Sequence, residues 1–343
     1  MLGLRSLTTA AAFPAPRATR RLAADPEGIA QAAALLREGG LVAFPTETVY
    51  GLGADATDAR AVAGIYAAKE RPSFNPLISH VPDVDAALAQ GRFGPKALAL
   101  ARAFWPGPLT LVVEKSADCA VADLATAGLG SVALRVPAHP VARALLAATG
   151  RPVAAPSANR SGRVSPTEAA HVLADLDGRI DAVLDGGATR VGLESTIVSC
   201  LGDAPVLLRP GGVPREAIEA LLGETLASGG HDAPEEGEAP LAPGMLASHY
   251  APRARVRLDA VDIAPGEAAL LFGGAKPAGL ERAVATRDLS PSGDLVEAAS
   301  GLFAALRALD AEGAATIAVT PIPMTGLGEA INDRLRRAAA PRG

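Results

Sequence analysis

Short apolar runs alternate with amphipathic stretches along most of this chain, which is the pattern of strands interleaved with helices. Asp25-Pro26-Glu27 is typical of a helix start, because Asp caps free N–H groups and Pro suits the first helical position, and Gly39-Gly40 would end that helix. Further helices are expected after Asp58 and at 95–104, 141–148, 167–176 and 214–222. Strands are expected at 41–44, 77–81, 109–113, 132–136, 152–155, 182–184, 196–199 and 206–208. Because several strands follow one another directly, the pattern favours an α/β domain with a mixed sheet.

The composition changes after Arg215. Seven acidic residues and no lysine or arginine lie between Glu216 and Tyr250, and 228–243 is rich in Gly, Pro and Glu without periodicity, as in a linker. Strands at 268–272 and 316–320, with a helical apolar face from 295 to 309 between them, predict a second, smaller α/β domain. The expected organisation is a disordered extension at 1–20, a large domain at 21–223, a linker at 224–253 and a small domain at 254–340.

Composition narrows the class of protein. A hydrophobic content of 49% excludes disorder for most of the 343 residues, and a net charge of −5 argues against a nucleic-acid-coated protein. Cys119 and Cys200 are far apart, which argues against a disulfide or a zinc site and favours a reducing cytosol. No apolar run approaches the ~20 residues of a membrane span. The Arg-rich start could be a mitochondrial transit peptide, but a disordered extension of a cytosolic protein is favoured.

The segment 69–77 carries candidate chemistry. Lys69, Arg71 and Asn75 lie in a stretch that Pro72 and Pro76 keep out of regular structure. A stiff loop with two cations and an amide can hold a polyanion such as a triphosphate. A solvated loop after a helix is the alternative.

Other polar residues also lie where strands end, which is where α/β proteins gather their ligand sites. Thr46 to Tyr50 follow a strand, and the glycines at 51 and 53 suit either a close ligand or a tight turn. Arg135 lies inside an apolar strand and needs a carboxylate, either an internal one such as Glu47 or a substrate's.

Three more segments add to this set. Ser157 and Asn159 follow a strand, and the helix expected after Ser165 offers N–H groups to an anion, although ordinary capping explains Ser165 and Thr167 equally well. Glu194-Ser195 and Arg209 repeat the pattern of polar residues at strand edges.

A lone histidine such as His80 is usually structural, and His249-Tyr250 could dock the linker onto the first domain. Between 60 and 215, sixteen Lys and Arg face thirteen Asp and Glu, which mildly supports an anionic ligand.

In combination, seven segments resemble the threonylcarbamoyl-AMP synthase family. They are FPTETVYGLG (44–53), KERPSFNPL (69–77), FWPGPLTLVV (104–113), ALRVP (133–137), PSANRSG (156–162), GLESTIV (192–198) and LRPGG (208–212). PGMLASHYAP (243–252) and GEAINDRLRRAA (328–339) resemble the long, two-domain form. The resemblance implies a YrdC-like catalytic domain with a twisted mixed sheet and helices, then a linker and a smaller Rossmann-like α/β domain.

The resemblance also implies a reaction, in which a nucleotidyltransferase joins L-threonine, bicarbonate and ATP, with Mg²⁺, into L-threonylcarbamoyladenylate and pyrophosphate. A downstream threonylcarbamoyl transferase machinery would use this product to make N6-threonylcarbamoyladenosine at position 37 of ANN-decoding tRNAs. By the family's motifs, Lys69 and Arg71 would be catalytic. The residues implied for ATP are Lys69, Arg71, Asn75, Ser131, Asn159, Thr167, Arg209 and Tyr250. Those implied for threonine are Thr48, His80, Arg135, Ser157 and Ser195, and no protein metal ligands are expected.

Two other functions are compatible with the same fold. One is a non-catalytic module that binds double-stranded RNA or tRNA on a concave positive surface. The acidic net charge and the hydroxyl- and amide-bearing loops favour a small-ligand pocket instead. The other is a carbamoyl-phosphate enzyme of the same fold, which carries zinc-finger parts that two cysteines cannot build.

Overall fold

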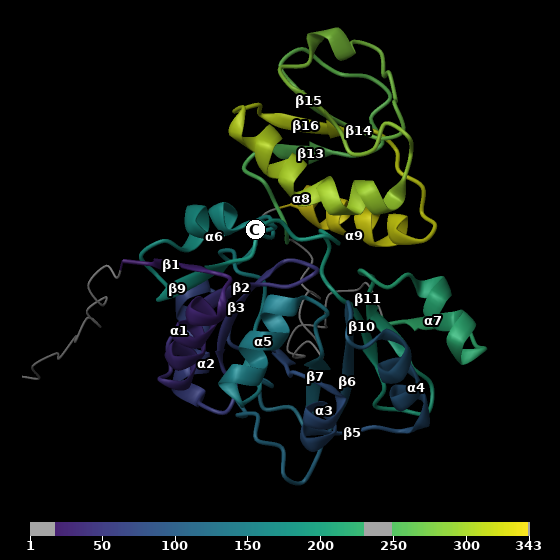
Figure 1. The fold of residues 1–343 in the computed structure, drawn as a ribbon. Helices are drawn as coiled ribbons and strands as arrows, with labels where there is room; N and C mark the ends of the chain where they lie inside the picture. The colour runs from purple at the N-terminus through teal and green to yellow at the C-terminus, as the bar shows by residue number, and fades with distance from the viewer. Residues whose placement is uncertain (1–17, 230–248, 342–343) are drawn as a thin grey trace, which may run out of the picture.

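The computed structural model describes residues 18–229 and 249–341, and within them two α/β units pack against each other (Figure 1). The larger unit is built on a twelve-stranded sheet in the order β1-β9-β2-β3-β8-β4-β7-β6-β10-β11-β12, with β5 pairing β6. These strands are β1 (Arg20–Ala23), β2 (Val42–Pro45), β3 (Tyr50–Asp55), β4 (Ile78–His80), β5 (Gly91–Arg92), β6 (Leu109–Lys115), β7 (Ser131–Arg135), β8 (Val153–Ala154), β9 (Ala182–Asp185), β10 (Thr196–Ser199), β11 (Val206–Arg209) and β12 (Ala227–Ser228). Parallel and antiparallel pairs both occur, so the predicted mixed sheet is confirmed.

Helices cover both faces of this sheet. One face packs against α1 (Pro26–Arg37) and α5 (Pro140–Thr149) through residues such as Leu36 and Leu145. The other packs against α2 (Ala59–Lys69), α3 (Val84–Gln90), α4 (Pro95–Phe104), α6 (Ala169–Leu176) and α7 (Arg215–Leu222). Along β2 the side chains alternate between the two clusters, as the two-residue period of a strand requires.

Local sequence signals explain where several helices begin. The Asp25 carboxylate accepts a hydrogen bond from Gly28 N at 2.8 Å, and Asp58 accepts one from Arg60 N at 2.8 Å, so both predicted N-caps are confirmed. The start expected for α6 is wrong by two residues, because Ser165 does not cap a helix. Its hydroxyl donates instead to Glu194 Oε1 at 2.5 Å, and α6 begins at Ala169.

Two further expectations are corrected. Residues 50–55 form strand β3 of a hairpin with β2, and Gly53 is needed for close packing rather than for a turn. A Cβ there would lie 2.8 Å from Phe44 Cε1. The extension expected at 1–20 is too long, since Arg20 pairs with Ala182 and the Thr19 hydroxyl donates to Ile180 O at 3.1 Å. Most of the predicted linker, 230–248, lies outside the described residues.

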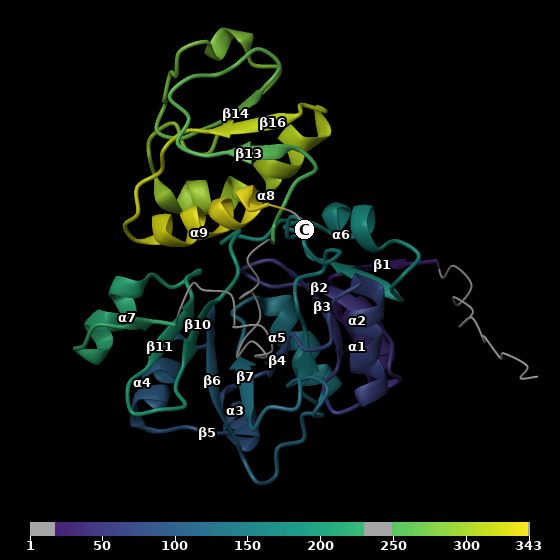
Figure 2. The same cartoon turned by 180° about the vertical axis from the view of Figure 1, so that it is seen from behind.

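The smaller unit is the predicted Rossmann-like α/β domain. Its four-stranded parallel sheet has the order β13-β16-β14-β15, with β13 (Arg255–Arg257), β14 (Ala268–Leu271), β15 (Thr286–Asp288) and β16 (Thr316–Val319). It is accompanied by the short 3₁₀ helix η1 (Leu280–Arg282), α8 (Leu295–Ala311) and α9 (Leu327–Ala339). Figures 1 and 2 show α8 and α9 on the side that faces the larger domain, with the small sheet beyond them. None of the helices in the described ranges is long and apolar enough to cross a membrane.

The two domains meet closely at Gly192, whose φ is +72°. A Cβ at this position would lie 2.4 Å from Ala299 O and 2.5 Å from Ser300 O, both on α8. Glycine is therefore required here both for its backbone conformation and for the approach of α8 to the loop that leads into β10.

We expect Gly192→Ala to lower the free energy of unfolding by more than about 2 kcal/mol, since it adds a backbone clash to the ~1–2 kcal/mol cost of a left-handed alanine. Urea denaturation at neutral pH measures this. Gly223→Ala is the matched control, because Gly223 has φ +69° with nothing within 4 Å of its Cβ. Equal losses in the two variants would contradict a role for Gly192 in domain packing.

Candidate active site

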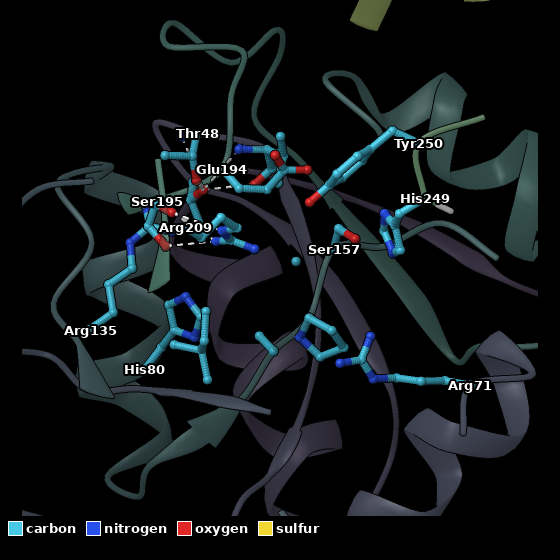
Figure 3. A pocket seen from close by; sticks show the side chains of 16 residues that line it. Thr48, Arg71, His80, Arg135, Ser157, Glu194, Ser195, Arg209, His249 and Tyr250 are labelled. Atoms are coloured by element: carbon cyan, nitrogen blue, oxygen red, sulfur yellow. Dashed lines mark hydrogen bonds between the residues drawn. The ribbon is translucent and has the colours of Figure 1, made fainter. Parts of the chain in front are cut away.

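A cavity of about 50 Å³ lies where the loops of the large sheet meet the segment that enters the small domain. Figure 3 shows its labelled side chains converging from separate strands and loops. Eight of the thirteen ligand residues expected from the sequence line it: Thr48, Arg71, His80, Arg135, Ser157, Ser195, Arg209 and Tyr250. Other lining residues include Thr46, Val49, Gly51, Ile78, Ala155, Pro156, Glu194 and His249. Lys69, Asn75, Ser131, Asn159 and Thr167 do not line this cavity.

Arg135 is held by an internal carboxylate. Its Nη2 donates to Glu47 Oε1 at 2.6 Å, and Glu47 Oε2 accepts from Ala138 N at 3.0 Å. Burial raises the pKa of Glu47, but the charge and hydrogen bond of Arg135 outweigh it and hold this pKa below 4.5. The sequence leaves open whether Arg135 pairs with an internal carboxylate or with a substrate carboxylate, and in the structure it pairs with Glu47. Arg135 also lines the cavity.

His80 sits beside this pair as a neutral imidazole. Burial, with a smaller contribution from the Arg135 charge, lowers the pKa of His80 to about 3. Its buried Nδ1 has no hydrogen-bond partner among the described residues. A neutral ring beside a fixed guanidinium can contact a polar ligand without adding charge to the cavity.

Arg209, which is buried, and Arg71, which is half-buried, differ from Arg135 in having no carboxylate partner among the described residues. Neither lies within salt-bridge distance of a carboxylate in the described parts of the chain, and the buried Nε of Arg71 has no hydrogen-bond partner there. Arg71 Nη2 donates to Pro76 O at 3.2 Å, and Arg209 Nη2 donates to Ser195 O at 2.8 Å. Burial lowers the pKa of Arg71 to about 10, which still leaves it charged at neutral pH. The cavity wall thus holds two guanidinium groups without a direct carboxylate partner in the described residues, although the charge of Glu194 acts on Arg209 from a longer distance.

Lys69 has a different position from the one expected. It is the last residue of α2 rather than part of a loop, its side chain is buried, and Nζ donates to the carbonyls of Ser157 (2.6 Å) and Asn159. Burial, and next the Arg71 charge, lower the pKa of Lys69 well below its usual range. In this structure the ammonium group fixes the loop that presents Ser157.

The other expected ligand residues lie outside the lining of the cavity, and Ser131 belongs to a separate pocket with Arg92 and Glu114. Both polar atoms of the buried Asn75 amide lack partners in the described ranges, as does Asn159 Oδ1, while Asn159 Nδ2 donates to Arg160 O and Arg163 O at 2.8 Å. Thr167 N donates to His171 Nδ1 at 3.3 Å, and Ser131 begins β7. Both asparagines therefore retain unused hydrogen-bonding capacity, which in Asn159 is that of the acceptor oxygen alone.

Tyr250 and His249 form one wall of the cavity (Figure 3). The Tyr250 ring stacks on Phe303 of α8 with centroids 5.7 Å apart, and Ala251 N donates to Gly162 O at 2.8 Å. The expected docking of this segment onto the first domain is confirmed by that bond.

Thr46, Glu194 and His249 also line the cavity, although none of the three was among the expected ligand residues. The Thr46 hydroxyl orders the β2–β3 turn by accepting from Thr48 N and Val49 N at 3.2 Å. Glu194 could have been suspected from its place beside Ser195, but its partner Arg334 is 140 residues away in the chain. No group of three or more His, Cys, Asp or Glu that could hold a metal ion occurs in 18–229 or 249–341.

The fold and the site define a two-domain α/β protein with an anion-suited cavity at the domain junction. A family model described as "Telomere recombination" (Sua5_yciO_yrdC) matches residues 34–211, and one described as "Threonylcarbamoyl-AMP synthase, C-terminal domain" matches 213–340. A threonylcarbamoyl-AMP synthase of Bacillus subtilis is 46% identical over 334 residues, covering 93% of this chain and 94% of that protein. One from Pyrococcus abyssi is 44% identical, covering 91% and 94%.

A solved structure agrees with these matches. The crystal structure of P. abyssi Sua5 complexed with L-threonine superposes with a TM-score of 0.82 at 40% identity, covering 94% of this chain and 97% of that one. The chain belongs to the threonylcarbamoyl-AMP synthase family.

We expect Glu47→Gln to lower the free energy of unfolding by about 3 kcal/mol at neutral pH, because Arg135 is left as an uncompensated buried charge. The folded-state pKa of Glu47 is depressed, so its contribution is complete above about pH 4.5 and is lost as the pH falls through the folded-state value. Urea denaturation between about pH 3 and pH 8 measures the difference from the unmodified protein.

The exposed Glu114, 3.6 Å from Arg92, provides the control Glu114→Gln, for which we expect a change below about 0.5 kcal/mol. A Glu47→Gln difference that persists undiminished at the lowest pH would show that the charge is not what stabilises this pair.

Proposed function

We propose that this protein is a nucleotidyltransferase that makes L-threonylcarbamoyladenylate and pyrophosphate from L-threonine, bicarbonate and ATP. The observation that carries the proposal is the pair of guanidinium groups of the buried Arg209 and the half-buried Arg71, neither of which pairs with a carboxylate in the described residues. Burying a charge without a counter-ion costs several kcal/mol, which a polyanionic ligand would recover. A nucleotide triphosphate has the charge and size for this, and family membership supports the same assignment.

We assign the phosphates of ATP to Arg71 and Arg209, with Asn75 Nδ2 as a further donor, while Asn159 Oδ1 would accept from a hydroxyl or amino group of the nucleotide. Ser131 and Thr167 remain proposed ATP ligands although they lie outside the present cavity. Lys69 supports the site by holding the 157–159 loop through two carbonyls. A direct phosphate contact by Lys69 would require it to give up those bonds.

For threonine, we propose that Arg135 binds the carboxylate, since guanidinium and carboxylate pair in a planar, bidentate geometry. Glu47 keeps the Arg135 side chain oriented before the substrate arrives. Thr48, Ser157 and Ser195 supply small hydroxyls around the substrate, and the neutral His80 faces it without repelling its amine.

The chemistry requires positioning and charge neutralisation rather than a covalent enzyme intermediate. The threonine amine attacks the carbon of bicarbonate or CO₂ and forms a carbamate, with loss of water or a proton. A carbamate oxygen then attacks the α-phosphorus of ATP, and the bond to the β-phosphate oxygen breaks as pyrophosphate leaves. The arginines stabilise the charge on the phosphates. Mg²⁺ would bind mainly through those phosphates, because no protein cage for it exists in the described residues.

Because Tyr250 and His249 wall the cavity, we propose that they move aside to admit ATP and threonine. Closing again would exclude water from the carbamate and the mixed anhydride. The product would pass to a threonylcarbamoyl transferase machinery that modifies tRNA, for which the cytosol is the proposed location.

We expect Arg71→Met to lower threonine-dependent pyrophosphate release by about 10²–10³-fold, the usual cost of a lost electrostatic contact to the reacting group. Without ligand, the free energy of unfolding should stay equal or rise, because the half-buried Arg71 guanidinium pairs with no carboxylate in the described residues. A pyrophosphate assay with ATP, bicarbonate and either threonine, serine or no amino acid, together with urea denaturation, measures both effects.

Arg92→Met is the control, as Arg92 is exposed and does not line the cavity. Salt-sensitive binding of double-stranded RNA without pyrophosphate release would instead favour the RNA-binding alternative. Pyrophosphate release that does not depend on threonine would contradict threonine as the substrate. Loss of stability in parallel with activity would show that Arg71 is structural.

A further inference from the structure

The C-terminal domain places one fully buried charged side chain next to the cavity. Arg334 lies on α9 and is 0% exposed. Its guanidinium donates hydrogen bonds to the catalytic domain and to a residue of its own helix. Nε donates to Glu194 Oε2 at 2.7 Å, Nη2 donates to Pro210 O at 3.0 Å, and Nη1 donates to Asp333 Oδ2 at 2.5 Å. An arginine so placed contributes nothing to solubility and holds three parts of the chain in one geometry.

Each of the partners of Arg334 in the catalytic domain adjoins a proposed ligand residue. Glu194 lines the cavity and precedes Ser195, while Pro210 follows Arg209. The guanidinium also lies over the Tyr250 ring, with Cζ 5.0 Å from its centroid, within the range of a cation–π contact. Arg334 therefore reaches the nucleotide side of the cavity at three points without lining the cavity itself.

Further contacts make this arrangement rigid. Glu194 Oε1 accepts a hydrogen bond from Ser165 Oγ at 2.5 Å, so both carboxylate oxygens are occupied. Asp333 also accepts from Arg337 Nε at 3.1 Å, which braces the carboxylate against α9. A buried network with its donors and acceptors satisfied has one low-energy geometry, and a partly satisfied one is costly.

We propose that Arg334 is a positioning residue through which the C-terminal domain holds Glu194, the Arg209-Pro210 segment and Tyr250 in the closed, reactive arrangement. The proposal rests on the proposed function and assigns to the second domain a role in nucleotide use. Of the five residues proposed for threonine, Thr48, His80, Arg135 and Ser157 come from strands and loops outside the hydrogen bonds of Arg334, and only Ser195 adjoins one of its partners. ATP and threonine should therefore respond differently to its loss.

The test compares Arg334→Met and Arg334→Lys in the full-length protein. For Arg334→Met we expect the KM for ATP to rise about tenfold and kcat to fall about tenfold, while the dissociation constant for threonine, measured by calorimetry, changes less than about twofold. Arg334→Lys keeps the positive charge but lacks the planar guanidinium that bonds several partners at once. We therefore expect smaller changes in KM for ATP and in kcat than for Arg334→Met, again with little change for threonine.

Glu329→Gln is the matched control. Glu329 lies on the same helix and pairs across the same domain interface with Arg215 at 2.6 Å, but neither lines the cavity. All its constants should stay within about twofold of those of the unmodified protein.

Unchanged ATP constants in a folded Arg334→Met, or equal losses for ATP and threonine, would overturn the positioning role. If Arg334→Met does not fold, the test depends on Arg334→Lys. A KM for ATP and a kcat equal to those of the unmodified protein in that variant would overturn the proposal. The unmodified protein tests the proposed function separately, since an absence of threonine-dependent pyrophosphate release there counts against that function and not against Arg334.

Discussion

Positive charge buried at the domain junction is the constraint that organises this molecule. In a medium of low dielectric, a guanidinium needs a carboxylate, a set of hydrogen bonds or an anionic ligand. Arg135 has Glu47, and Arg334 has Glu194 and Asp333. Arg71 and Arg209 have only carbonyl and hydroxyl oxygens among the described residues. This difference separates cations that hold the structure from cations that are suited to a ligand.

The same constraint links the two domains. The carboxylate that satisfies Arg334 belongs to the loop before β10, and that loop can meet the small domain only because Gly192 lets α8 approach. Arg215–Glu329 and Arg307–Asp175 add ion pairs across the same junction at 2.6 and 2.8 Å. The second domain thus contacts residues that line the cavity. Tyr250, one of these lining residues, packs against Phe303 and Arg334 of that domain.

Sequence signals that lie within one short segment predicted the bounds of helices and strands well. The helix 95–104 and the strand 196–199 have the bounds expected, because a proline start, an aromatic-proline stop and a β-branched run act locally. Expectations that depended on partners elsewhere were wrong more often. Ser165 resembled a helix cap but bonds Glu194, and Gly53 resembled a turn glycine but packs under Phe44. Lys69 resembled a loop cation but closes a helix end and holds two carbonyls.

The sequence by itself determined the mixed α/β architecture, the second domain, the family and half of the residues that line the cavity, because periodicity, caps and ordered motifs are properties of short segments. Only the tertiary structure decided which cations are neutralised internally. It also decided that Glu47 holds Arg135 and that Arg334 reaches across to Glu194, since these pairs are separated by 88 and 140 residues. Electrostatic compensation depends on distance in space and on burial, and neither can be read from positions along a chain.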